Sequence, residues 1–239
     1  MCIHLNLMIF TKIIRGFIST KPGSALINAI KSKSVVDLGK EYAELGIDAL
    51  LESNALESIP FVNTVVGLYK AAGHVRDQIF TDKFVRFLTP LSDMPEEERI
   101  EMAERLNEDD KFAGKAGARL IEIIDRMESE NKPELAANFI KAFARKEVDF
   151  DTLRHLLFAL ERIPAFDICE LALFSSNNGV GTRTNGDPLM VGFVGAGLGI
   201  NNGATDGGYI VPTQLCRSFV EAGRLKVKNA KNDLETMFD

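Results

Sequence analysis

The sequence predicts a mainly α-helical fold, in which a multi-helix bundle precedes a small C-terminal α+β unit. From Ser34 to about Arg162, apolar residues recur at three- and four-residue steps, the spacing of one helical face, and the connections are short. After Pro164, charged residues become rare, and glycine and asparagine are interspersed among apolar residues. We therefore expect three parts: a basic amphipathic segment (1–23), a helical body (24–163) and a C-terminal unit (164–239).

Start and stop signals divide the helical body. Glu96–Glu98 follow Pro95 and favour a helix start there, because acidic side chains complement the positive end of the helix dipole. An eleven-residue apolar run, Ile59–Tyr69, is too short for a membrane span and predicts a buried core helix. The other helical segments are expected at 34–56, at 78–91, at 109–128, from Asn131 onward, and from Val148 to a stop before Pro164.

The N-terminal segment combines an apolar face with positive charge. The first 36 residues contain five lysine or arginine residues and no acidic one, although the whole chain has a net charge of −6. Such a helix can lie on an anionic membrane surface. A helix packed on the core, an extension upstream of a start at Met8 and an organelle-targeting sequence are alternatives. The candidate membrane-contacting residues are Phe10, Lys12, Arg15 and Phe17.

The C-terminal unit shows the signals of a helix, a hairpin and a second helix. Asp187-Pro188 predicts a helix start, and the glycines at 195–197 predict its end. Two strands are expected at 198–200 and 208–211, joined by a loop over 201–207. Thr213 is expected to cap the final helix.

This order resembles the C-terminal half of winged-helix domains. The matching residues are Gly197-Leu198, the hairpin, Gly208-Tyr209-Ile210-Val211 and Thr213–Phe219. Where that family often has glycine in the closing helix, this chain has Cys216. The body, through Ile59-Pro60 and Lys83–Leu88, resembles a group of helical bacterial proteins that are sometimes encoded with prophage or phage-defence genes. This second resemblance implies no chemistry.

A winged helix suggests DNA binding, but the charge pattern argues against it. No lysine or arginine lies between Arg183 and Arg217, although duplex affinity depends on such cations near phosphates. If the chain does bind nucleic acid, the candidate residues are Arg183, Arg217, Arg224, Lys226 and Lys228.

No motif indicates an enzyme, a metal site or a cofactor. Residues 191–199 resemble a dinucleotide-binding fingerprint, but Ile200 occupies the position that requires a small residue. The three histidines are isolated, and Cys2, Cys169 and Cys216 form no metal-binding or disulfide pattern. We expect no cofactor and no metal. An enzyme site assembled from scattered residues stays open as an alternative.

These observations favour a non-enzymatic protein-interaction module in a bacterial-type cytoplasm, with a further peripheral contact to the inner membrane through the N-terminal segment. Its partner would be another protein or a second copy of the chain. The expected contact residues are Met190, Phe193 and Val194, because they are apolar where a DNA-binding wing would be cationic. The alternatives are a winged-helix transcriptional regulator and a membrane-active effector.

Overall fold

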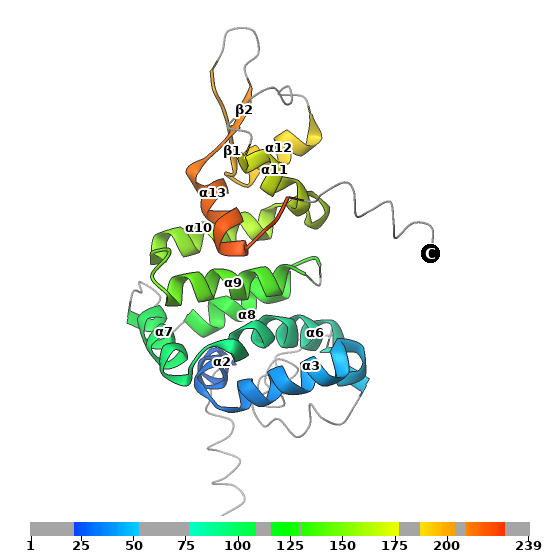
Figure 1. The fold of residues 1–239 in the computed structure, drawn as a ribbon, viewed down its shortest axis with the longest axis vertical. Coiled ribbons are helices and arrows are strands. Elements are labelled where there is room, and N and C mark those ends of the chain that lie inside the picture. The colour runs from blue at the N-terminus through cyan, green and yellow to red at the C-terminus, as the bar shows by residue number, and fades with distance from the viewer. Residues whose placement is uncertain are drawn as a thin grey trace, which may run out of the picture. The chain divides into compact units, whose positions relative to one another are not determined.

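The structure is a computed structural model, and it describes residues 22–52, 77–108, 116–129, 131–176, 187–203 and 209–227. Most of these residues are helical, and the described sheet has two antiparallel strands (Figure 1). The predicted fold class is therefore confirmed. Most of the predicted N-terminal segment and the apolar run Ile59–Tyr69 lie outside the described residues.

The chain divides into two compact units, Met1–Arg126 and Met127–Asp239. The described elements of the first unit are α2 (Pro22–Lys31), α3 (Ser34–Glu52), α6 (Asp77–Leu88), the 3-10 helix η1 (Thr89–Asp93), α7 (Glu96–Glu108) and α8 (Ala116–Arg126). Those of the second are α9 (Lys132–Ala144), α10 (Phe150–Arg162), the 3-10 helix η2 (Ala165–Glu170), α11 (Leu171–Ser176), α12 (Pro188–Gly195), β1 (Gly199–Asn201), β2 (Ile210–Pro212) and α13 (Gln214–Gly223).

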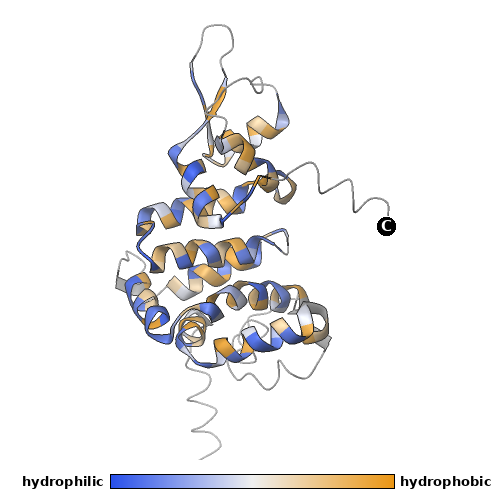
Figure 2. Cartoon of the chain, viewed as in Figure 1, coloured by the Kyte–Doolittle hydropathy of each residue, from blue (hydrophilic) through white to orange (hydrophobic). Residues whose placement is uncertain are grey.

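In the first unit, α2 packs closely on α8, and α3 packs on η1 and α6. The approach of α2 and α8 depends on glycine at both Gly23 and Gly117, since a Cβ atom on Gly117 would overlap the carbonyl oxygen of Gly23. Hydrophobic and hydrophilic residues alternate along α3 in Figure 2, as the periodicity predicted. The expected single helix over 34–56 is kinked at Gly46, whose φ of 72° lies in the left-handed region.

A buried arginine holds the end of α2 in place. The guanidinium of Arg99 on α7 is buried and donates three hydrogen bonds to carbonyl oxygens. These run to Ile30 (2.8 Å), Ser32 (2.9 Å) and Met94 (2.6 Å). The first two acceptors lie at the C-terminal end of α2, where helix carbonyls lack intrahelical partners. Burial lowers the pKa of Arg99, against the opposing effect of Glu96 and Glu97.

The second unit is built around α9. Ten of its residues are buried, and α10 and α13 both pack against it. The rings of Phe139 on α9 and Phe219 on α13 meet edge to face with centroids 4.9 Å apart. Since α13 packs on both α9 and α10, these two helices share a unit with the hairpin. The division of the chain therefore falls after Arg126, whereas the sequence placed a boundary after residue 163.

Three predicted helix starts are confirmed by capping hydrogen bonds. Asp149 accepts from the Thr152 N–H (2.7 Å), Asp187 from the Leu189 N–H (2.9 Å) and Thr213 from the Cys216 N–H (3.1 Å). These bonds satisfy backbone donors that the first helical turn leaves without partners. The caps of α12 and α13 fix where the two helices begin on either side of the hairpin.

Candidate functional site

The hairpin lies against α12 by one of its two faces. In its register, Gly199 pairs with Pro212 and Asn201 with Ile210, so these four residues share a face. A Cβ atom on Gly199 would lie 2.8 Å from Ile210 and 3.4 Å from Phe193, which shows how closely this face approaches α12. The turn between α12 and β1 is possible because Gly197 adopts a φ of 76°.

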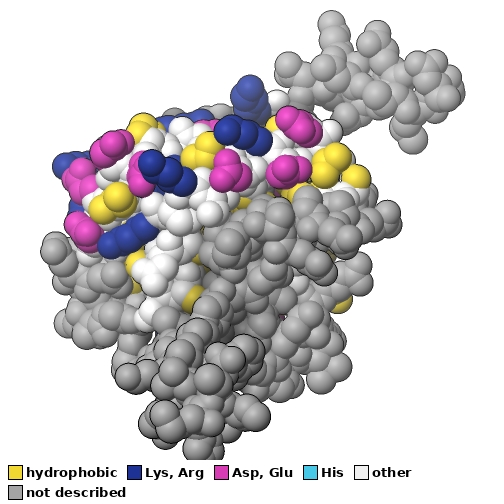
Figure 3. All heavy atoms as spheres, turned by 90° about the horizontal axis from the view of Figure 1, so that it is seen from below, with side chains coloured by type: hydrophobic (Ala, Val, Ile, Leu, Met, Phe, Trp, Pro, Cys, Tyr) yellow, Lys and Arg dark blue, Asp and Glu magenta, His cyan; other side chains and the backbone are white. Residues whose placement is uncertain are grey.

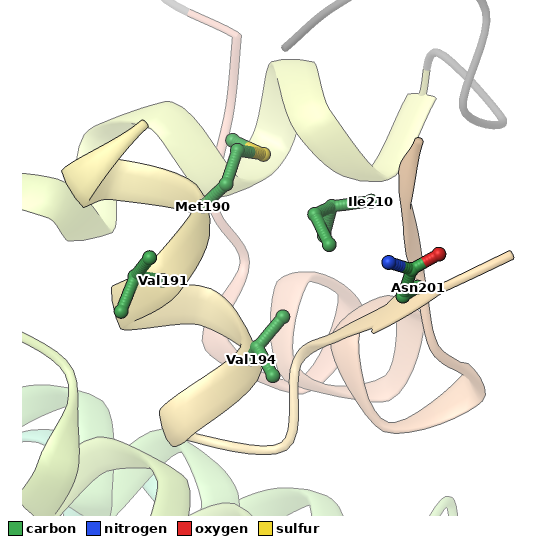
Figure 4. Close-up of a pocket in the computed structure, with 5 residues that line it drawn as sticks. All are labelled: Met190, Val191, Val194, Asn201 and Ile210. Atoms are coloured by element: carbon green, nitrogen blue, oxygen red, sulfur yellow. The ribbon is translucent and has the colours of Figure 1, made fainter. Parts of the chain in front are cut away.

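A pocket of about 220 Å³ opens between α12 and the hairpin (Figure 4). Its lining residues are Met190, Val191, Val194, Asn201 and Ile210, and we call this surface the α12 face. Met190 and Val194 project from α12 toward the side where Ile210 and Asn201 lie, while Val191 lies on the outer side of the helix. The lining is apolar except for the Asn201 side chain, so the pocket offers contact area and one hydrogen-bonding group.

The structure separates the three expected contact residues. Phe193 is fully buried, with its ring centroid 4.9 Å from that of Phe174 on α11, and Met190 is also buried although it borders the pocket. Phe193 is therefore a core residue and not a surface contact. Val194 is 42% exposed, as expected of a contact residue. The sequence could not separate them because α12 is apolar on all sides and has no polar stripe that marks the solvent face.

Sequence reasoning missed three residues of the α12 face. Val191 is 57% exposed, and Asn201 and Ile210 come from the two strands. The signal for Val191 was its position one turn after Asp187, a capping residue at the helix surface. The sequence predicted the hairpin with Ile210 in its second strand but placed Asn201 in the loop, and it gave no sign that this pair lies beside α12.

The residues around α12 carry negative charge. A Cβ atom on Gly192 of α12 would lie 3.6 Å from a carboxylate oxygen of Asp167, so this side chain borders the helix. Burial raises the pKa of Asp167, and the nearby charges of Glu170 and Asp187 raise it further. The Asp167 carboxylate therefore lies close enough to Glu170 and to Asp187 to be repelled by both.

The candidate membrane and nucleic-acid residues lie elsewhere or outside the described residues. Phe10, Lys12, Arg15, Phe17, Arg183 and Lys228 are not among the described residues. Arg217 is half-buried on α13, Arg224 caps the end of that helix in a left-handed conformation, and Lys226 is exposed beyond it. None of these three lines the α12 face. On the face drawn in Figure 3, the described cationic and anionic side chains are intermingled and form no patch of one sign.

Within the described parts of the chain, no group of three or more histidine, cysteine, aspartate or glutamate residues could hold a metal ion. Among the helices that the structure describes, none is long and apolar enough to cross a membrane. Burial raises the pKa of the Cys216 thiol to about 11, so it stays protonated at neutral pH and is a poor nucleophile. Residues 191–199 run from a helix into a strand, the reverse of the strand-to-helix order that a dinucleotide fingerprint requires.

Comparison with protein-family models, curated proteins and solved structures finds no match for this chain. The resemblances to winged-helix domains and to prophage-associated or defence-associated proteins therefore stay predictions.

Proposed function

We propose that this chain is a non-enzymatic protein-interaction module and that the α12 face is its contact surface. The observation that carries the proposal is the exposure of Val191 and Val194 beside an apolar pocket on a folded, capped scaffold. Apolar side chains at the centre of a contact surface supply most of the free energy of association. Asn201 at the edge supplies a polar group that can fix the orientation of a partner.

The size of the pocket favours a protein partner over a small-molecule substrate. At about 220 Å³, the pocket is smaller than the roughly 300–1,000 Å³ typical of ligand and cofactor sites. It is suited to an apolar side chain inserted by a partner. The residues that line it include no histidine, cysteine, serine or charged group that could act as a nucleophile, acid or base.

DNA binding receives less support from this surface. Neither α12 nor the described part of the hairpin carries a lysine or arginine, so this surface would not neutralise phosphates. Arg224 and Lys226, two exposed cations of the second unit, follow α13, and neither lines the pocket.

Affinity capture from cell extracts tests the proposal when three forms of the full chain are compared by quantitative mass spectrometry. The forms are the natural chain, Val191→Ser with Val194→Ser, and the control Ile79→Ser, which changes an exposed apolar residue of the first unit. Serine and valine have similar helix propensity, so α12 should still form. We expect at least one protein to be retained by the natural chain and the control and to fall about tenfold with the double variant.

Self-association through the same face is measured by light scattering on the three forms. If the three forms retain the same proteins and have the same molecular mass in solution, the α12 face is not a contact surface and the proposal is wrong.

A further inference from the structure

The surroundings of the α12 face indicate what kind of partner it accepts. From residue 164 to residue 216, the described residues include the acidic Asp167, Glu170 and Asp187 and no lysine or arginine. Most of the described helices elsewhere in the chain carry both signs of charge, for example in the pairs of Glu122 with Arg119 and Arg126. The described charges within 164–216 are thus all negative, and the nearest described cations along the chain are Arg162 and Arg217, one at each side of this range.

Two of these acidic residues border α12 directly. Asp187 is the residue that caps its N-terminus, and the Asp167 carboxylate borders its middle at Gly192. Glu170 follows on the same 3-10 helix as Asp167 and raises the pKa of Asp167 by its charge. The exposed side chains of Val191 and Val194 form a ridge on α12. The pocket lies on one side of this ridge, the Asp167 carboxylate lies on the other side, and Asp187 lies at the N-terminal end of the helix.

We infer that the α12 face binds a helical segment of another protein whose apolar side carries lysine or arginine along one border. This inference rests on the proposed function and specifies its partner. Apolar side chains of such a helix, spaced three or four residues apart, would enter the pocket and cover Val191 and Val194. Its cations would lie beside Asp167 and Glu170, where they relieve the repulsion between the carboxylates.

The same charges disfavour other occupants of this surface. Duplex DNA and anionic lipid headgroups would both place negative charge beside Asp167, Glu170 and Asp187. An acidic peptide would be repelled for the same reason. Charge complementarity therefore selects a cationic partner, and the apolar ridge and pocket require that it also present apolar side chains.

A pair of synthetic peptides tests the inference with the full chain. One is a fluorescein-labelled helix of about 16 residues, long enough for some helicity in water, with leucine at three- and four-residue steps and lysine elsewhere. Its counterpart replaces every lysine with glutamate. Binding is measured by fluorescence anisotropy at low and at moderate salt, since salt weakens exposed charge pairs. We expect the lysine peptide to bind and the glutamate peptide to bind at least about tenfold more weakly.

Variants then show where the lysine peptide binds. Asp167→Asn with Glu170→Gln removes charge beside α12 and should weaken binding about fivefold to tenfold while relieving repulsion in the free chain. The control, Glu147→Gln with Asp151→Asn, makes the same change of charge at the exposed corner between α9 and α10 and should leave affinity within about twofold. Val191→Ser with Val194→Ser should also weaken binding.

Three results would overturn the inference. Equal weakening by the acidic pair and the control would show general attraction to a chain of net charge −6. If neither peptide binds, a cationic amphipathic helix is not the partner of the α12 face. Equal binding of both peptides, lost in the Val191/Val194 variant, would refute the cationic partner and leave the proposed function standing. Whether the proposed function itself fails is decided separately, by the capture experiment.

Discussion

Replacing Arg99 with methionine tests whether the buried guanidinium holds α2 against the rest of the first unit. Methionine keeps most of the length and apolar volume of the side chain but removes the three donors. The carbonyl oxygens of Ile30, Ser32 and Met94 then lose the hydrogen bonds that satisfy them (2.6–2.9 Å in the structure). A buried acceptor left without a partner destabilises the folded state by its full desolvation free energy.

The expected magnitude follows from the number of bonds and from the burial of the charge. Each hydrogen bond from a charged donor contributes about 1.5–3 kcal/mol, so three bonds amount to roughly 5–9 kcal/mol before other effects. Removing the guanidinium also removes the unfavourable burial of a charge, a penalty of several kcal/mol in folded proteins. The net loss should therefore be about 3 kcal/mol, a large part of the roughly 5–15 kcal/mol that stabilises a typical domain.

Urea unfolding followed by far-ultraviolet circular dichroism measures this loss, and hydrogen exchange locates it. The matched control is Arg119→Met on α8, which removes an exposed arginine paired with Glu122 and should change stability by less than about 1 kcal/mol. Amide exchange in residues 22–32 should accelerate with the Arg99 variant and not with the control. If both variants unfold at the same urea concentration, with unchanged exchange in α2, the bonds from Arg99 do not hold this helix.

Three further predictions concern packing and pH. Phe193→Ala should destabilise the chain by about 3–5 kcal/mol because its ring is fully buried, whereas Val194→Ala should destabilise it by less than about 0.5 kcal/mol. Thermal unfolding measures both losses, and equal losses would contradict the assignment of Phe193 to the core. Gly117→Ala should destabilise by about 1–3 kcal/mol through overlap with α2, whereas Gly195→Ala, with no atom within 4 Å of its added Cβ, should be neutral or slightly stabilising. Burial raises the pKa of Glu128, but hydrogen bonds from the buried Lys132 ammonium (3.1 Å) and the Ala165 N–H (2.9 Å) lower it more, so the net shift is downward. A lowered folded-state pKa gives stability that is present above the unfolded pKa, near 4.3, and is lost as pH falls through the folded value. Glu128→Gln should therefore destabilise by about 1 kcal/mol at pH 7, a figure reduced for the 58% exposure of the carboxylate. The difference from the natural chain should shrink as the pH falls below the unfolded pKa. A difference that is constant with pH would exclude this ion pair as its source.

The sequence by itself determined the local elements of this protein. Apolar spacing located most of the described helices, and capping residues such as Asp149, Asp187 and Thr213 marked where three of them begin. These features could be predicted because they depend on residues within one helical turn of each other. The scarcity of cations between Arg183 and Arg217 was likewise visible in the sequence and directed attention to α12.

Only the tertiary structure decided which side of each element is buried against what. Because α12 is apolar all round, its contacts with Phe174 and the hairpin were needed to separate the buried Phe193 from the exposed Val191 and Val194. The place of Arg99 against Ile30 also joins residues 69 positions apart, and the approach of Asp167 to Gly192 joins two separate helices. Such pairings depend on how whole helices pack, and this packing is fixed by the shape of many side chains together rather than by a local pattern.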